Sequence, residues 1–322
     1  MVTAPATDQT PAPLADHRPG EPEAIFIVGV SRSGTTLMRN ILERSPRIAL
    51  ARENHYLGHL RASEGTRDYF RRLGELHSDE TIARIVNLVY SGEYQRQSRW
   101  REISPFWRWL VEEVPHDEMV RRLLSSDRTE RGIWAAFLRA YADKQGRPIM
   151  GEKTPAHLAY VDTLLEWFPN GRVVHMMRDP RGVYVSDLRR RRLKLRKPYS
   201  SLGRVPGLLP SVILLQVTLL WRNAARRHAA YQRRYPDRYR MVRFEDVVGR
   251  PDEVLAQLFA FLGVEVPPDP TNVRVMARGF KWGAEGIDAE AADRWRAHIG
   301  RFPNWWLRTA LRSSMNELGY RS

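Results

Sequence analysis

The segment over residues 24–45 constrains the fold of this 322-residue chain more than any other part of the sequence. It starts with AIFIV, a continuous apolar run that Gly29 ends. A strand that is apolar at every position is typical of a sheet covered on both faces, as parallel sheets are. A helical pattern over residues 35–45 follows, and Pro46 ends it. The sequence therefore predicts a buried strand, a short loop and a helix in direct succession.

Apolar strands and helical patterns alternate along the rest of the chain. Such alternation predicts one α/β domain over residues 23–322, with a central parallel sheet flanked by helices in a three-layer, P-loop-like arrangement. Residues 1–22 are rich in proline and predict a disordered leader, whereas residues 55–145 predict a mostly helical insertion. Further strands are predicted at residues 48–50, 148–150, 172–177 and 239–244, and further helices at 155–168, 180–195 and 251–262.

The loop GVSRSGTT, residues 29–36, connects the first strand to its helix. In this position backbone N–H groups and the positive end of the helix can hold phosphate groups. The spacing is that of a nucleotide-triphosphatase phosphate loop, except that Thr35 stands where the lysine belongs and Arg32 supplies the cation. The sequence also lacks a strand that ends in the bare aspartate such enzymes use for Mg²⁺. These departures favour an anion site without a metal, and a P-loop kinase or triphosphatase is the alternative.

Two further motifs lie at the ends of predicted strands. GEKTP, residues 151–155, places Lys153, one of five lysines, where a compact positive charge can approach an anionic reacting centre. RDPRGVYVS, residues 178–186, places Arg178 at a strand end and Ser186 two turns into the next helix, so that both can hold one phosphate. Asp179 is interpreted as the cap of that helix, because Pro180 follows at its first position.

Together the three motifs resemble those of the sulfotransferase superfamily, which uses 3′-phosphoadenosine 5′-phosphosulfate (PAPS). The first motif is similar to that family's 5′-phosphosulfate loop, and the third to its 3′-phosphate motif. RSGTTL at residues 32–37 resembles the branch that contains tyrosylprotein sulfotransferases and many bacterial enzymes. Residues 55–145 carry no resemblance. The likeness spans residues 25–320, since it extends to VRFED at 242–246, RWR at 294–296 and LGY at 318–320.

The resemblance implies roles in an in-line transfer of a sulfuryl group to a hydroxyl or phenol. Arg32 and Lys153 would stabilise the bridging oxygen of the leaving adenosine 3′,5′-bisphosphate (PAP). Glu53 lies at the spacing of the glutamate that acts as general base in the tyrosylprotein branch, and His55 is the alternative base, because cytosolic sulfotransferases use histidine. Two side chains would hold the 3′-phosphate of PAP, Arg178 and Ser186, and four loop residues would hold its 5′-phosphate through their amides, Ser33, Gly34, Thr35 and Thr36.

Charge and composition restrict the compartment and the partners. The chain has 52 Lys and Arg against 37 Asp and Glu, a net charge of +15, and no cysteine, which excludes disulfides and predicts a reducing, cytoplasmic location. No signal peptide is expected, and residues 208–221 are interpreted as a buried helix of a soluble protein. The basic run at residues 189–197 is either a solvated helix end or a rim that attracts an anionic cofactor or an acidic acceptor. A basic nucleic-acid-binding protein is a further alternative, supported by charge alone.

The acceptor is expected to be a small molecule that carries a hydroxyl or a phenol. Residues 55–145 are expected to bind it, and neither nucleic acid nor a membrane is expected as a partner. The oligomeric state stays open. An aromatic cluster in the insertion allows two interpretations, core packing or an acceptor pocket, and its members are Trp100, Phe106, Trp107 and Trp109.

Overall fold

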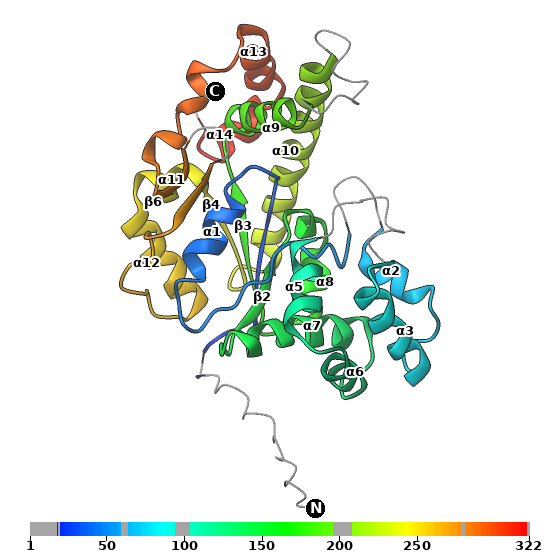
Figure 1. Cartoon of the computed structure of the whole chain (residues 1–322). Helices are drawn as coiled ribbons and strands as arrows, with labels where there is room; N and C mark the ends of the chain where they lie inside the picture. The colour runs from blue at the N-terminus through cyan, green and yellow to red at the C-terminus, as the bar shows by residue number, and fades with distance from the viewer. Residues whose placement is uncertain are drawn as a thin grey trace, which may run out of the picture.

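Four parallel strands form the central sheet of the protein (Figure 1). The computed structural model describes residues 18, 20–58, 64–93, 104–195, 208–277 and 281–320. The sheet has the order β2-β1-β3-β4, which confirms the predicted α/β class with a parallel sheet. Its strands are β1 (Ala24–Gly29), β2 (Met150–Lys153), β3 (Arg172–Met177) and β4 (Tyr239–Arg243).

The register brings the carboxyl ends of the strands to one edge of the sheet. Ile27 of β1 pairs with Lys153 of β2, and Gly29 pairs with Met176 of β3. The loop after β1, the end of β2 and the residue after β3 therefore meet at this edge. Open parallel sheets bind ligands at the carboxyl ends of their strands.

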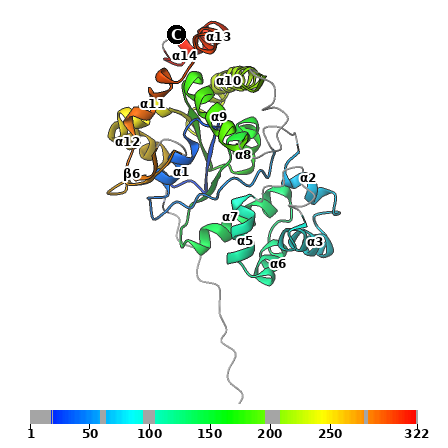
Figure 2. The same ribbon diagram turned by 45° about the horizontal axis from the view of Figure 1, so that its top comes forward.

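Helices cover both faces of the sheet, because alternate residues of β1 point to opposite sides. Ile25 and Ile27 belong to a core with α1 (Thr35–Leu42), α11 (Phe244–Gly249) and α12 (Pro251–Leu262). Phe26 and Val28 belong to a second core. Figure 2 shows the same layers from a second direction. The second core includes residues of η1 (Pro155–Tyr160), α7 (Glu130–Lys144), α8 (Val161–Trp167), α9 (Pro180–Leu195) and α10 (Leu208–Arg234).

Within residues 55–145, the described part of the chain is helical and packs beside the β2 side of the sheet (Figure 1). Phe106 and Trp107 are fully buried in the core, and Trp109 packs against it, which favours core packing for these three residues. Trp100 lies outside the described residues. Besides α7, the helices are α2 (Thr66–Arg71), α3 (Asp79–Tyr90), α5 (Pro105–Glu113) and α6 (His116–Leu124).

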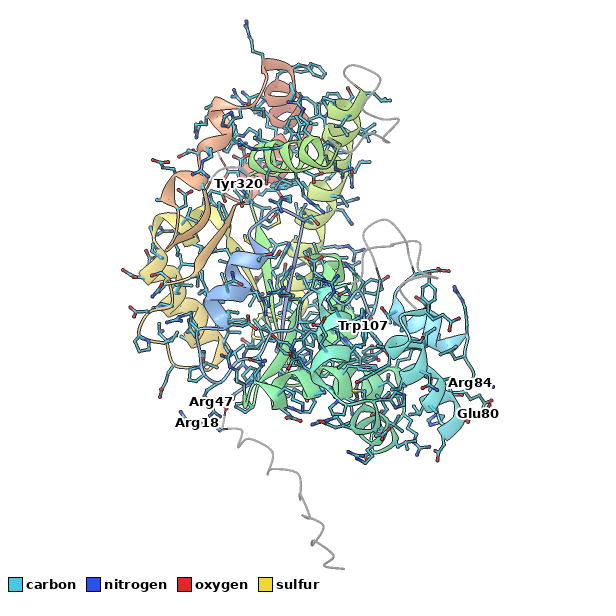
Figure 3. The ribbon with its side chains drawn as sticks, in the orientation of Figure 1. Arg18, Arg47, Glu80, Arg84, Trp107 and Tyr320 are labelled. Atoms are coloured by element: carbon cyan, nitrogen blue, oxygen red, sulfur yellow. The ribbon has the colours of Figure 1, made fainter. Side chains whose placement is uncertain are left out.

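The C-terminal part of the chain returns to the carboxyl edge of the sheet. The segments η4 (Arg294–Ala297) and α13 (Arg301–Ala310) contact α9, and α13 also contacts α10. Figure 3 shows Tyr320, near the C-terminus, at this edge. The elements are the antiparallel pair β5 (Arg274–Ala277) and β6 (Lys281–Glu285), followed by η3 (Ala289–Ala291), η4 (Arg294–Ala297), α13 (Arg301–Ala310) and α14 (Arg312–Glu317).

Some predicted boundaries differ from the structure. The strand predicted at residues 148–150 is β2, which begins at Met150 and includes Lys153. Residues 48–50 do not form a full strand, but Ile48 and Ala51 make parallel bridges to residues beside and within β2. The helix predicted over residues 35–45 ends at Leu42.

The predicted leader, residues 1–22, lies mostly outside the described residues. Glu21 at its end is not disordered, because it accepts a hydrogen bond of 2.6 Å from the guanidinium of Arg47. This ion pair fixes the chain directly before β1. The described part of the protein therefore includes the last residues of the predicted leader.

The interpretation of residues 208–221 as a buried helix is wrong for one face of α10. Ile213, Val217 and Trp221 are buried, whereas Leu215 and Leu219 are more than half exposed. Within the described residues, α10 alone is long and apolar enough to cross a membrane by length and composition, and 39% of its most apolar window is buried inside the protein.

Candidate active site

The loop between β1 and α1 needs glycine at two positions. A Cβ at Gly29, whose φ is 147°, would lie 2.4 Å from the carbonyl oxygen of Met176. A Cβ at Gly34, whose φ is 91°, would lie 2.5 Å from the ring of Phe244. Arg32 also has a positive φ, 77°, which is uncommon for a residue with a side chain. The loop is thus held in a tight conformation against β3 and the start of α11.

The N-terminus of α1 presents polar groups without protein partners. Gly34 caps this eight-residue helix and provides no side-chain hydrogen bond. Ser33 is fully buried, and its Oγ has no partner among the described residues. Thr35 is also buried, and Thr36 is partly exposed. Backbone N–H groups at such a helix start bind phosphate or sulfate groups.

Arg178 follows β3 directly and is held from several sides. Its guanidinium lies 4.2 Å from the ring centroid of Phe244 and donates a 2.7 Å hydrogen bond to the carbonyl of Ala291. A second nitrogen lies 3.3 Å from the carbonyl of Arg32, and the indole of Trp221 donates to the Arg178 carbonyl at 2.9 Å. The side chain is therefore fixed between the loop, α11 and the C-terminal segment.

The positive charge of Arg178 is incompletely compensated. Its Nε is buried without a partner among the described residues. Burial lowers its pKa to about 10, although the nearby Glu245 carboxylate acts in the opposite direction. A buried cation in this state gains stability from a bound anion.

Ser186 lies at the same place, as the sequence predicted. Its Oγ accepts a 3.1 Å hydrogen bond from Nε of Arg32. The structure thus brings Arg32, Arg178 and Ser186 together from the loop, the end of β3 and α9. This arrangement is a positively charged cluster with hydroxyl groups at the carboxyl edge of the sheet.

Lys153 and Glu53 form a second cluster at this edge. The Lys153 ammonium lies 2.5 Å from Oε1 of Glu53, and Nε2 of His55 lies 3.7 Å from Oε2. Desolvation by burial acts to raise the pKa of Glu53, but the Lys153 ammonium, His55 and Arg190 together hold that pKa below its usual value. Glu53 is therefore an ionised carboxylate in direct contact with its neighbouring cation, and 38% of its side chain is exposed.

The backbone around Glu53 is fixed by Asn54 and Ser104, which the sequence did not indicate, and by Trp107 of the aromatic cluster. Asn54 is buried, and its backbone carbonyl accepts a 3.1 Å hydrogen bond from the indole of Trp107. The Ser104 hydroxyl donates to the carbonyl of Glu53. The start of α5 in the insertion therefore holds the Glu53 loop directly.

A buried network connects the same loop to β2. Nδ1 of His157 bonds to Glu152, and Nε2 of His157 accepts a 3.2 Å hydrogen bond from the Leu57 amide. This contact identifies Nδ1 as the donor to the carboxylate. The Thr154 hydroxyl donates to the second oxygen of Glu152 at 2.6 Å. No signal in the sequence pointed to this network, because the predicted strand ended at residue 150 and left Glu152 outside it.

Four further residues lie near Arg178. Asp179 has the role that the sequence predicted, whereas the contacts of the other three were not predicted. Asp179 is the helix cap that the sequence predicted, since its carboxylate accepts from the Arg181 amide at 2.8 Å. It also pairs with the Arg181 side chain, which stacks 4.2 Å from the ring of Trp295. Phe244, seen in the sequence as part of a strand motif, begins α11 and carries the Arg178 stack.

The basic run at residues 189–197 is partly placed. Arg191 pairs with Asp187 at 2.9 Å and contacts Gln216, while Arg190 acts on the pKa of Glu53. Arg190 is exposed, and its guanidinium lies 3.9 Å from the carboxylate of Asp187. Side chains beyond Arg192 lie outside the described ones. Among the described residues, no group of three or more His, Cys, Asp or Glu side chains forms a metal site.

Comparison with known proteins identifies the family. Residues 22–268 match the Sulfotransferase family. Protein-tyrosine sulfotransferase A of Caenorhabditis elegans is 28% identical over 167 residues, 52% of this chain and 33% of the relative. Omega-hydroxy-beta-dihydromenaquinone-9 sulfotransferase Stf3 of Mycobacterium bovis is 30% identical over 112 residues, 35% of this chain and 28% of the relative. The match thus spans about a third of the length of these curated relatives.

Two solved structures share the fold. The sulfotransferase domain of the Synechococcus PCC 7002 olefin synthase has a TM-score of 0.57 at 21% identity, and the alignment covers 96% of this chain and 98% of that chain. The sulfotransferase domain from the curacin biosynthetic pathway has the same TM-score at 20% identity, with 93% and 98% covered. Since the family match covers most of the sequence, from the strand before the loop to beyond α12, this chain belongs to the sulfotransferase family.

Proposed function

We propose that this chain transfers the sulfuryl group of PAPS to a hydroxyl or phenol of a small-molecule acceptor and releases PAP. The observation that carries the proposal is the buried guanidinium of Arg178, whose Nε has no partner among the described residues. Burial of an incompletely compensated cation beside a glycine-containing loop favours an anionic ligand. The unpartnered Oγ of Ser33 supports the same ligand class.

The polar groups at the carboxyl edge fit the two ends of such a donor. Arg178 and Ser186 would hold the 3′-phosphate, and the amides of residues 33–36 at the start of α1 would hold the 5′-phosphate. The donor supplies the sulfuryl group when it is bound. Arg32, which bonds to Ser186, lies between these two sets of residues.

Glu53 and Lys153 supply the chemistry on the acceptor side. Glu53 accepts the proton that the acceptor hydroxyl loses as the sulfuryl group moves to its oxygen. Lys153 and Arg32 stabilise the negative charge that remains on the bisphosphate as the bond from sulfur to the bridging oxygen breaks. The contact between Lys153 and Glu53 holds both side chains at the reacting centre before substrates bind.

The same contact links the base to the donor. Lys153 lowers the pKa of Glu53 by its charge and its hydrogen bond. A bound anionic donor would compete for the Lys153 ammonium. Glu53 would then lose this partner, and its pKa would rise toward the range in which a carboxylate is an effective base. Donor binding would therefore prepare the base.

The acceptor would bind between the Glu53 loop and the insertion over residues 55–145. Support comes from Ser104 and Trp107, which hold the backbone of Glu53 and Asn54 from the start of α5. The name of one relative includes tyrosine, whose side chain is a phenol, and the name of the other includes an omega-hydroxy menaquinone. A phenol and a hydroxyl are the two acceptor groups proposed here, although the first name refers to a protein and only the second to a small molecule.

Calorimetric titration with PAP tests the proposal, with ADP and ATP·Mg²⁺ as comparators. We expect PAP to bind in the presence of a chelator, and Arg178→Ala to weaken binding by at least tenfold, because a charge-assisted phosphate contact contributes about 1.5–3 kcal/mol. Arg108→Ala, an exposed arginine on α5, is the matched control and should leave the affinity unchanged. Preferential Mg²⁺-dependent binding of ATP would overturn the proposal in favour of a P-loop kinase.

A further inference from the structure

The first three turns of α10 carry an apolar stripe that the described part of the protein does not cover. Its four members are spaced at i, i+4, i+7 and i+11, so they lie on one face of the helix. Their exposed fractions are 40% for Leu208, 42% for Val212, 54% for Leu215 and 55% for Leu219. The opposite face packs into the core of the protein and is buried.

Helix α13 extends this apolar surface. Phe302 is 60% exposed and Trp305 is 58% exposed, and their rings lie 5.9 Å apart. The adjacent Trp306 donates a 3.1 Å hydrogen bond to Thr218 of α10, so the two helices lie side by side. We call the exposed set the α10–α13 face, and it consists of Leu208, Val212, Leu215, Leu219, Phe302 and Trp305.

The charged side chains of α10 and α13 have a single sign. Neither α10 nor α13 contains an aspartate or a glutamate. Arg222 and Arg226 are exposed on α10, and Arg301 and Arg308 on α13. Exposed aromatic and aliphatic side chains bordered by arginines are typical of helices that lie in the interface of an anionic bilayer.

We propose that the α10–α13 face docks this chain onto the surface of an anionic lipid bilayer. Charge complementarity selects this occupant, because a second copy of the chain would bring two cationic faces together. The buried opposite side of α10 keeps the helix in the protein, so it lies along the membrane rather than across it. Figures 1 and 2 show α13 and the start of α10 beside α9, whose Ser186 belongs to the candidate active site.

Flotation of the full chain with lipid vesicles tests the docking. We expect it to float with vesicles of phosphatidylcholine mixed with phosphatidylglycerol, to stay behind with phosphatidylcholine alone, and to be released by salt. The double variant Phe302→Ser, Trp305→Ser should lower the partition coefficient about tenfold or more, because two large apolar side chains no longer enter the lipid. Arg308→Glu should also weaken binding.

Matched controls separate the face from general effects. Val266→Ser removes an apolar side chain that is 46% exposed elsewhere, and Arg108→Glu reverses an exposed charge on α5; both should float like the wild type. PAP affinity should be unchanged in the double variant, since none of the proposed donor contacts is altered. Failure of the wild type to float with the anionic vesicles, equal flotation of the double variant, or a dimer that this variant converts to a monomer would each overturn the proposal.

Discussion

At the scale of single residues, the contact between Lys153 and Glu53 determines which charges face the proposed reacting centre. The two side chains come from β2 and from the extended segment beside it, and they lie 2.5 Å apart. Because the Lys153 charge opposes protonation of Glu53, the carboxylate is ionised well below neutral pH. An ionised carboxylate is the form that accepts a proton.

Glu53→Gln tests the role of this carboxylate. The amide keeps the shape of the side chain but cannot accept the proton, so turnover should fall by about 10²- to 10⁴-fold while PAP affinity is kept. Steady-state kinetics with the acceptor and calorimetry with PAP measure the two effects. His55→Asn is the control, for which we expect a change of less than about tenfold. The opposite ranking of the two variants would move the base to His55.

The sequence pointed to the candidate site residues, but not to the residues that hold them in place. Arg32, Arg178 and Ser186 were found because each lies in a motif at a strand end or a helix start. The contacts of Asn54 and His157 with the base loop depend on chain segments about a hundred residues apart, as the bond from His157 to the Leu57 amide shows. No local pattern encodes such a pairing.

At the scale of elements, the start of α1 depends on the packing of α11. Gly34 lies against Phe244, and the same ring stacks on Arg178. One side chain of α11 therefore supports both the loop and the cation that follows β3. The position of Gly34 is determined by this contact as well as by its positive φ.

Gly34→Ala should disturb both supports. Alanine would have to adopt a left-handed backbone conformation at this position, and its Cβ would have to push the Phe244 ring away. We therefore expect at least tenfold weaker PAP binding. The free energy of unfolding should fall by more than the roughly 1–2 kcal/mol that the backbone conformation alone costs. Gly146→Ala is a matched control, because its φ is 65° and the Cβ meets open space. Urea unfolding and calorimetry of both variants measure the difference. Equal effects of the two substitutions would contradict the contact.

Elements with a clear local signal, such as an apolar run or a helix cap, were predicted within their observed bounds. Elements whose burial depends on distant parts of the chain were not. Strand β3 and helix α9 match their predicted bounds because an apolar run and a capped helix start define them. Strand β2 was predicted at residues 148–150, but it covers Met150–Lys153. Glu152 and Lys153 are charged and look like loop residues in the sequence, although both are buried in the structure. The first half of helix α10, up to Trp221, carries apolar residues on all sides, and the sequence does not tell which of these sides the rest of the chain covers.

At the scale of the whole molecule, a buried histidine couples stability to pH. His175 is fully buried in β3, and its Nδ1 lies 2.5 Å from the hydroxyl of Tyr239 on β4. Its Nε2 has no partner among the described residues. Burial, together with a smaller contribution from His228 on α10, lowers the pKa of His175 from 6.5 to about 3.

The sign of this coupling follows from the two pKa values. Below pH 6.5 His175 is protonated in the unfolded chain, whereas in the folded chain it stays neutral down to about pH 3. Stability is therefore lost as the pH falls through this range. Between pH 7 and pH 5 the contribution is about 2 kcal/mol. Urea unfolding at both values should show a decline that is smaller by this amount in His175→Asn, which retains a polar group near Tyr239. The same decline in both proteins would show that His175 is not responsible.

The strand order has a consequence for how this chain acquires its structure. The first strand, β1, lies inside the sheet, yet Ala24 pairs with Met150 and Ile25 with Arg172. During synthesis from the N-terminus, the most apolar strand therefore has no strand partner until β2 has been made, and its second partner, β3, comes later still. Pairings of such high sequence separation are slow, and an unpaired apolar strand is prone to aggregate. Expression of this chain should accordingly depend on chaperones that shield β1 until β3 emerges.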